Sequence, residues 1–207
     1  MTHSGTLYVV AAASGTGKTS LTQALVQRLP NIGISVSFTT RTQRPGEIQG
    51  VHYWFVSLAE FQTMIANDAF LEYAQVFGNY YGTSKQWVEQ QLQTSQDVIL
   101  EIDWQGARQV RLLFPEAVSI FILPPSVALL RERLQKRQQD QAQVIETRLA
   151  GSPAEISHFK EFDYLVVNDA FEEALRDLEA VVRATRLKQP RQTVKWRGLL
   201  EELLEMH

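Results

Sequence analysis

Cysteine is absent from the 207-residue sequence, and the four histidines are scattered from His3 to His207. The first absence excludes disulfide bonds, thiolate zinc sites and cysteine nucleophiles, and the scatter of the histidines leaves no cluster typical of a metal site. No apolar run approaches the length of about 18 residues that a membrane helix needs. The apolar run Leu7–Ala13 has no Lys or Arg before it, so we do not interpret it as a signal peptide. We therefore expect a soluble cytoplasmic protein.

An excess of basic residues is also absent. Lys and Arg number 20 against 23 Asp and Glu, which gives a formal net charge of −3 at pH 7. This balance argues against the broad basic surface that duplex nucleic acid selects, so we expect no nucleic-acid partner. The composition, with 44% hydrophobic and 21% charged residues, is typical of a globular protein. The length predicts one domain, or one core with an inserted lobe.

Four short apolar runs without alternation predict strands that are buried on both faces, as in a parallel sheet covered by helices. The first run is Leu7–Ala13, and the others are Val98–Asp103, Ser119–Leu123 and Tyr164–Val167. A helical stretch with leucines four residues apart follows the first run and stops at Pro30. The alternation of strands and helices predicts an α/β core with a doubly wound parallel sheet.

Residues 34–84 differ from this core. Ser35–Thr39, Val51–Val56 and Leu71–Phe77 predict strands joined by Gly/Pro turns, and a helix among them begins with the capping-box pair Ser57 and Glu60. We interpret this segment as an inserted mixed α/β lobe. Its many aromatic side chains are expected mainly to form a small core of its own.

Residues 126–150 combine an arginine-rich helix with a polar stretch, and we interpret them as a helical lid. The core of the single domain 1–207 then consists of residues 5–33, 85–125 and 151–207. Two further helices are expected near the C-terminus. Asp169 and Glu172 form a capping-box pattern before the helix predicted from 171 to 182. A last amphipathic stretch is expected to dock on the body through Trp196, Leu199, Leu200 and Leu203.

The segment between the first strand and the first helix matches the phosphate-loop pattern G-x-x-x-x-G-K-[ST], except that Ala12 stands at its first position. Its backbone N–H groups would form an anion nest at the positive end of the helix dipole and hold the phosphates of ATP. Lys18 would span the β- and γ-phosphates, and the Thr19 hydroxyl would face Mg²⁺. The predicted ATP-binding residues are Ala12, Ala13, Ser14, Gly15, Thr16, Gly17, Lys18 and Thr19.

A phosphate loop leaves the acceptor of the phosphoryl group open among water, a protein and a small molecule. Residues Asp103–Gly106 mimic the D-x-x-G segment of GTPases, but no Lys has an Asp two residues later, which argues against a GTPase. Arg41 and Arg44 lie near Tyr53 and Tyr81 in the inserted lobe and could converge on one phosphate. The sequence thus predicts a second phosphate site.

Several motifs occur together in the order seen in guanylate kinases. They are Ser37-Phe-Thr-Thr-Arg-Thr-Gln-Arg-Pro-Gly-Glu47, Gly50-Val-His-Tyr-Trp-Phe-Val56, Phe70-Leu-Glu72, Gly78-Asn-Tyr-Tyr-Gly-Thr83, Glu101-Ile-Asp-Trp-Gln-Gly106 and Pro124-Pro-Ser126. The sequence resembles this family from about Gly5 to Arg186, and its bacterial members most. The resemblance implies a P-loop NTPase-type parallel sheet covered by helices, a GMP-binding lobe, a helical lid, and transfer of the γ-phosphoryl group of ATP to GMP with Mg²⁺.

The resemblance also implies roles for individual residues. Guanine presents N1–H and N2–H₂ as adjacent hydrogen-bond donors, and a carboxylate can accept from both. The resemblance implies that Glu72 is this carboxylate. Asp103 would lie near the amino group or the metal shell, so Thr19 and Asp103 are the expected Mg²⁺ residues. The expected GMP-binding set is Ser37, Arg41, Arg44, Tyr53, Glu72, Tyr81, Thr83 and Asp103. The expected catalytic set is Lys18, Arg41, Arg133, Arg137 and Arg148, the last three being lid arginines.

The sequence departs from the family pattern at Ala12 and Ala13, where Gly-Pro is common, at Glu101, where Asp is frequent, and after Arg137, where a glycine is often found. Two other hypotheses stand beside the kinase. One is a catalytically inactive guanylate-kinase-like module that binds proteins, although such modules typically have a degraded phosphate loop. The other is a kinase of the same fold that acts on a ribose phosphate. No role follows from the sequence for the basic run 183–197 beyond a solvated face.

Overall fold

Two β-sheets organise the chain, as a computed structural model describes it for residues 5–136 and 142–205. The first sheet has five parallel strands in the order β2-β7-β1-β8-β9, and the second has four strands in the order β4-β3-β6-β5. The strands are β1 (Leu7–Ala12), β2 (Ile32–Ile34), β3 (Phe38–Thr39), β4 (Trp54–Phe55), β5 (Phe70–Val76), β6 (Asn79–Ser84), β7 (Asp97–Glu101), β8 (Val118–Leu123) and β9 (Tyr164–Val167).

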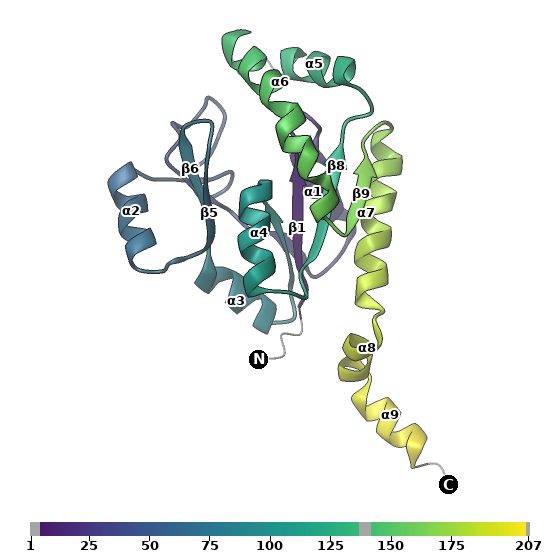
Figure 1. Cartoon of the computed structure of the whole chain (residues 1–207). Helices are drawn as coiled ribbons and strands as arrows, with labels where there is room; N and C mark the ends of the chain where they lie inside the picture. Colours follow the sequence, from purple (N-terminus) through teal and green to yellow (C-terminus); the bar gives the residue numbers. More distant parts are fainter. Residues whose placement is uncertain (1–4, 137–141, 206–207) are drawn as a thin grey trace.

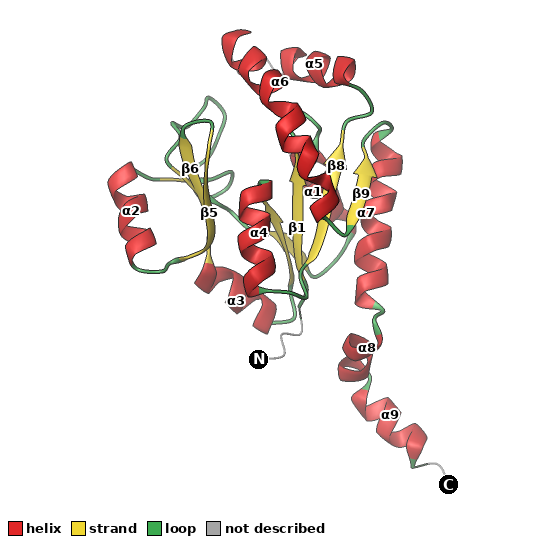
Figure 2. Cartoon of the chain, viewed as in Figure 1, coloured by secondary structure: helices red, strands yellow, loops and turns green. Residues whose placement is uncertain are grey.

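Helices flank both sheets (Figures 1 and 2). They are α1 (Lys18–Arg28), α2 (Leu58–Ala66), α3 (Lys85–Gln93), α4 (Trp104–Leu113), α5 (Val127–Lys136), α6 (Ala142–Ser157), α7 (Phe171–Arg186), α8 (Gln189–Lys195) and α9 (Arg197–Leu204), with a short 3₁₀ turn η1 (His158–Glu161) after α6.

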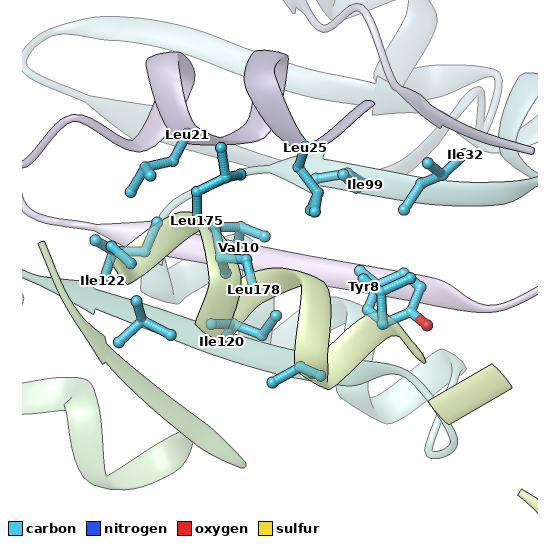
Figure 3. Close-up of a cluster of buried hydrophobic side chains, with 14 of the residues drawn as sticks. Tyr8, Val10, Leu21, Leu25, Ile32, Ile99, Ile120, Ile122, Leu175 and Leu178 are labelled. Carbon is cyan, nitrogen blue, oxygen red and sulfur yellow. The ribbon is translucent and has the colours of Figure 1, made fainter. Parts of the chain in front are cut away.

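The central strand β1 is buried on both faces because successive side chains point to opposite sides of the sheet. Tyr8 and Val10 pack against α1 and α7, as Figure 3 shows with Leu21 and Leu178 among the helical side chains. On the other face, Leu7 and Val9 pack with residues of α3 and α4. The prediction of a parallel sheet covered by helices is confirmed. The expectation of burial on both faces is wrong for the edge strand β9, in which Tyr164, Leu165 and Val167 are exposed.

The inserted lobe is built on the second sheet, which lies beside the central sheet with α2 on its outer side (Figure 2). Ser57 and Glu60 form the predicted capping box at the start of α2. The sequence prediction missed β6, which pairs antiparallel with β5 after a tight turn at Phe77 and Gly78, both with positive φ. Strand β6 is polar and contains a glycine, so it lacks the apolar pattern that identified the other strands.

The lid segment contains α5 and the first part of α6, which continues to Ser157 and includes Pro153. Residues 137–141 lie outside the described residues, so the structure does not place the predicted lid arginine Arg137. The division into core, lobe and lid at the predicted boundaries stays a prediction.

Two expectations about the C-terminal region are wrong. Helix α7 has Ala170 as its N-cap without a side-chain hydrogen bond, so Asp169 forms no capping box. The last amphipathic segment does not dock on the body, because α8 and α9 lead away from it (Figure 1). Trp196, Leu199 and Leu203 of this segment are 46%, 47% and 54% exposed.

The basic run 183–197 has a structural role that explains this path. Arg186 and Arg191 both pair at 2.8 Å with the carboxylate of Asp97, which is fully buried at the start of β7. These two ion pairs attach the end of α7 and the start of α8 to the sheet, and the chain continues outward from there. Within the described part of the chain, no helix has the length and apolar character to cross a membrane.

Candidate active site

The phosphate-loop residues connect β1 to α1 at the carboxyl end of the central strand. Gly15 and Gly17 have φ values of 90° and 95°, a region that side chains rarely adopt, and a Cβ on Gly17 would lie 2.5 Å from Nδ2 of Asn168. Ala12, in contrast, is the last residue of β1, where a Cβ causes no strain. The departure from glycine at this position is therefore compatible with a phosphate loop.

Two side chains from distant segments hold the loop in place. Asn168 follows β9 and donates from Nδ2 to the carbonyl oxygen of Thr16 at 2.6 Å. Arg133 of α5 donates to the same oxygen at 3.2 Å and to the carbonyl oxygen of Asn168 at 3.1 Å. The sequence analysis missed Asn168, although a polar residue directly after a parallel strand is a recognisable signal, since the carboxyl ends of such strands meet at one edge.

Lys18 is the first residue of α1, and its ammonium group donates to the carbonyl oxygen of Ile102 at 3.4 Å. Burial lowers the pKa of the Lys18 ammonium group, while the carboxylates of Glu101 and Asp103 act in the opposite direction. The neighbouring carboxylates thus favour the charged form of Lys18 against the effect of burial.

The two carboxylates at the carboxyl end of β7, Glu101 and Asp103, have different surroundings. The hydroxyl groups of Thr19 and Thr22 both donate to Glu101, the first at 2.8 Å. Asp103 caps α4, because its Oδ1 accepts from the backbone N–H of Gly106 at 2.9 Å and its Oδ2 accepts from Gln105 at 2.9 Å. The structure thus brings Glu101, rather than Asp103, into contact with the Thr19 hydroxyl.

Threonine and carboxylate oxygens are the hard ligands that Mg²⁺ prefers, and Mg²⁺ commonly takes one or two protein ligands together with substrate phosphates. Thr19 and Glu101 fit such a site. The described residues contain no group of three or more His, Cys, Asp or Glu side chains that could hold a metal ion by themselves.

Glu72 of β5 is the buried carboxylate of the lobe, with 3% exposure. The Thr83 hydroxyl of β6 donates to its Oε1 at 2.6 Å. A Cβ at Gly106 would lie 2.4 Å from its Oε2, so the absence of a side chain there makes room for the carboxylate. Burial, assisted by the charge of Asp103, raises the pKa of Glu72 to about 7.

Arg41 lies close to the aromatic side chains predicted to accompany it. Its guanidinium carbon is 5.3 Å from the centroid of the Tyr53 ring, and the rings of Tyr53 and Tyr81 pack edge to face at 5.9 Å. Burial raises the pKa of the Tyr53 hydroxyl to about 12, so it remains a hydrogen-bond donor at neutral pH.

A carboxylate that the sequence analysis did not select joins the two arginines. Glu47 accepts from Nη2 of Arg41 at 2.6 Å and from the backbone N–H of Arg44 at 2.7 Å. The hydrogen bonds from these two groups lower the pKa of Glu47, although burial opposes them. Glu47 thereby fixes the arginine side chain relative to the loop that carries both arginines.

One cavity of about 620 Å³ contains most of the predicted site. Its lining includes the whole phosphate loop, Arg148, Glu101, and Ser37, Arg41, Arg44, Tyr53, Glu72, Tyr81 and Asp103. Thr83 lies behind Glu72, outside the lining. A second cavity of about 370 Å³ borders the other side of the loop and is lined by Gly15, Gly17, Ser20, Arg133, Lys136, Asn168 and Phe171.

The two described lid arginines thus reach different faces of the loop. Arg133 borders the second cavity, whereas Arg148 of α6 donates from Nη1 to the Ser14 hydroxyl at 3.1 Å on the side of the first cavity. Glu155, another residue absent from the sequence prediction, also lines the first cavity and accepts from the backbone N–H of Ser14 at 3.3 Å.

Comparisons with known proteins identify the family to which the chain is similar. A family model described as guanylate kinase matches residues 4–185. Guanylate kinase of Vibrio parahaemolyticus is 55% identical over 202 residues, covering 97% of this chain and 98% of that protein. Guanylate kinase of Saccharophagus degradans is 58% identical over 204 residues, covering 99% and 100%. A crystal structure of guanylate kinase from Anaplasma phagocytophilum superimposes with a TM-score of 0.78 at 35% identity, covering 98% of this chain and 97% of that one.

Proposed function

From the premise that this chain belongs to the guanylate kinase family and transfers the γ-phosphoryl group of ATP to GMP, we propose that its cavities divide into a donor half and an acceptor half. The first cavity joins the phosphate loop to the lobe residues, so donor and acceptor phosphates would meet within it. The second cavity extends the donor half on the other side of the loop.

The donor half would bind ATP. The loop N–H groups and Lys18 would hold the phosphates at the positive end of α1. The adenosine portion would occupy the second cavity, between Arg133 and Phe171. Thr19 and Glu101 would hold Mg²⁺, which supplies charge neutralisation for the phosphates when it is bound.

The acceptor half would bind GMP. Arg41, Arg44, Tyr53 and Tyr81 would hold its phosphate as a set of fixed donors. Glu72, oriented by Thr83, would accept from N1–H and N2–H₂ of guanine, with Ser37 and Asp103 near the base. Adenine lacks this pair of adjacent donors and would leave a buried carboxylate unpaired, so AMP would be rejected.

The chemistry needs no general base from the protein. The attacking GMP phosphate is largely ionised at neutral pH, because its second pKa is about 6. Catalysis would therefore consist of holding the two phosphates in line and stabilising the charge of the transferred group, by Lys18 and by Arg41, Arg133, Arg137 and Arg148. Closure of the lid and lobe would exclude water, which limits wasteful hydrolysis of ATP.

The observation that carries the proposal is the shared cavity, which Lys18 at the start of α1 and Glu72 of β5 both line. We propose nucleotides rather than nucleic acid as partners, consistent with the net charge of −3, and a cytoplasmic location, where both nucleotides are available.

The test is a coupled assay of ADP formation with Mg·ATP and with GMP, AMP, UMP, CMP or no acceptor. We expect ADP only with GMP. ADP formation without any acceptor would indicate an ATPase, and GMP binding without turnover would indicate the inactive interaction module. Turnover of a ribose phosphate in preference to GMP would show that Glu72 does not read a base.

A further inference from the structure

Helix α6 contacts the phosphate loop through two side chains of opposite charge. Arg148 and Glu155 are seven residues apart, which places them two turns apart on one face of a helix. The arginine donates to the Ser14 hydroxyl at 3.1 Å, and the glutamate accepts from the Ser14 backbone N–H at 3.3 Å. The same helix thus binds both the side-chain hydroxyl and the backbone N–H of Ser14.

Two residues of α6 between Arg148 and Glu155 affect the hydrogen bonds of the helix backbone. Pro153 interrupts the backbone hydrogen-bond ladder between the two residues. Ser152 is buried and donates from its hydroxyl to the carbonyl oxygen of Arg148 at 2.8 Å. Ser152 and Pro153 thus lie between the two residues that contact Ser14.

Glu155 lies near charged residues of the first cavity, which include the cations proposed to bind phosphate. Lys18 and Arg148 favour its ionised form and Asp103 disfavours it, while burial raises the pKa of the carboxyl group. The Ser14 N–H that it binds belongs to the loop whose N–H groups attract anions. A carboxylate of the protein itself thus accepts a hydrogen bond from the loop that is expected to bind anions.

We propose that Glu155 is a selectivity residue, whose carboxylate binds the Ser14 N–H of the phosphate loop and competes there with small free anions such as inorganic phosphate. A small anion would have to displace this carboxylate with only the few contacts available at the loop. ATP also gains contacts in the second cavity and along the remaining loop N–H groups, so it displaces Glu155. This inference rests on the proposed binding of ATP phosphates by the loop.

The test compares the wild-type protein with Glu155→Gln by calorimetric titration with inorganic phosphate and, separately, with Mg·ATP. Removing the charge beside the site should lower the Kd for inorganic phosphate about tenfold or more. The gain for Mg·ATP should be smaller, because ATP binding is distributed over many contacts. Unchanged or weaker binding of phosphate by Glu155→Gln would overturn the proposal.

Glu146→Gln is the matched control, because Glu146 lies on the same helix with 60% of its side chain exposed and pairs with Arg131 on the surface. It should bind phosphate as the wild-type protein does, and an equal gain in both variants would overturn the proposal by showing a general charge effect. Lys18→Ala separates this inference from the proposed function. If Lys18→Ala bound Mg·ATP as the wild-type protein does, the assignment of ATP to the loop would fail, whatever the result at Glu155.

A second measurement on the wild-type protein covers the case that Glu155→Gln does not fold. The side-chain carboxyl ¹³C resonance of Glu155, assigned with Glu155→Asp, should shift when Mg·ATP is added, because the carboxylate leaves the Ser14 N–H. Inorganic phosphate at an equal concentration should leave this resonance in place. An unchanged chemical shift of the Glu155 carboxyl carbon after addition of Mg·ATP would overturn the proposal.

Discussion

The Thr83 hydroxyl donates a hydrogen bond of 2.6 Å to Oε1 of Glu72, and both side chains are buried. The bond joins β6 to β5 across the lobe sheet and fixes the orientation of the carboxylate. It also favours the ionised form, yet burial outweighs it and the pKa of Glu72 stands at about 7. The protonation of Glu72 should therefore depend on pH near neutrality, and so should GMP binding if this carboxylate contacts guanine as proposed.

GMP binding is expected to release a proton from Glu72. Only the ionised carboxylate can accept from both N1–H and N2–H₂, so bound GMP lowers the pKa of this group. A fraction of a proton should be released near pH 7, and the release should fall as the pH rises above the pKa of the empty site, where Glu72 is already ionised. In the same way, the KM for GMP should rise as the pH falls below 7. Calorimetry in buffers of different ionisation enthalpy measures the proton release directly.

Glu72→Gln is the control for that measurement. The amide cannot lose a proton in this range, so the buffer dependence should disappear, and kcat/KM for GMP should fall by about 100-fold because one guanine donor faces an amide N–H₂. A proton release that persists in Glu72→Gln would place its source elsewhere in the site.

Mg²⁺ dependence should distinguish Glu101 from Asp103. Glu101 accepts from Thr19, whereas both oxygens of Asp103 are engaged at the N-terminus of α4. Glu101→Gln should therefore raise the Mg²⁺ concentration for half-maximal activity by about tenfold, in the range seen when groups that orient a metal are lost. Asp103→Asn should change the Mg²⁺ requirement less. The opposite order would return the metal role to Asp103, as the resemblance to the family first implied.

Glu47 is expected to act as a positioning residue for the GMP phosphate. It binds Arg41 and the backbone N–H of Arg44 at once, so Glu47→Gln should loosen the arginine and raise the KM for GMP by about tenfold, with a smaller change in kcat. Steady-state kinetics with varied GMP test this, and the KM for ATP should not change. Glu173→Gln, on the exposed surface of α7, is the matched control. A lower KM for GMP in Glu47→Gln would instead mean that Glu47 competes with the substrate phosphate for Arg41.

Lys18→Ala should abolish turnover, with a fall in kcat of about 10³-fold or more, because a buried positive charge at the transferred phosphoryl group is lost. GMP binding, measured by calorimetry without ATP, should remain largely intact because most of the residues proposed to bind GMP lie in the inserted lobe and not in the phosphate loop. Lys85→Ala removes a surface lysine paired with Asp68 and should leave kcat unchanged. Full turnover of GMP by Lys18→Ala would contradict the role of the phosphate loop.

The parts of this fold that sequence predicts are those in which local pattern and tertiary burial agree. The strands β1, β7 and β8 are apolar because helices cover the sheet, so their composition reports their environment. The edge strand β9 is also apolar, but Tyr164, Leu165 and Val167 are exposed, so its composition predicted the strand and not its burial. Strand β6 carries polar side chains toward the site and was missed for that reason. The apolar stripe of α9 could be recognised in the sequence. Such a stripe does not identify the surface that packs against it, and the expectation that it docks on the body was wrong.

The same distinction applies to the site. The phosphate loop and the lobe motifs are local in sequence, so their residues could be selected directly. Asn168 and Glu155 reach the loop from positions more than 130 residues away, and no spacing rule connects them to it. The role of the basic run 183–197 likewise could not be predicted from the sequence. The structure shows that Arg186 and Arg191 pair with the buried carboxylate of Asp97 at the start of β7.

That carboxylate, Asp97, should be a determinant of stability rather than of catalysis. It is fully buried and binds the Thr6 backbone N–H, Arg186 and Arg191, each at 2.8 Å, at the start of β7, whereas the phosphate loop follows the opposite end of β1. Asp97→Ala would leave the backbone donor and two guanidinium groups without their common acceptor, and removing one partner of a buried ion pair costs about 3 to 5 kcal/mol. Urea denaturation should show a loss of at least about 3 kcal/mol in the free energy of unfolding.

Two further measurements separate this effect from others. Glu173→Ala removes an exposed carboxylate 4.0 Å from Arg176, and its unfolding free energy should change by less than about 0.5 kcal/mol, as is usual for exposed ion pairs. Asp97→Ala, assayed at a temperature where it is folded, should keep a kcat close to that of the wild-type protein, because its contacts lie far along β7 from the loop. A large fall in kcat without a loss of stability would mean that the anchoring of α7 and α8 affects the active site, and the role of Asp97 would then extend beyond holding the C-terminal helices to the sheet.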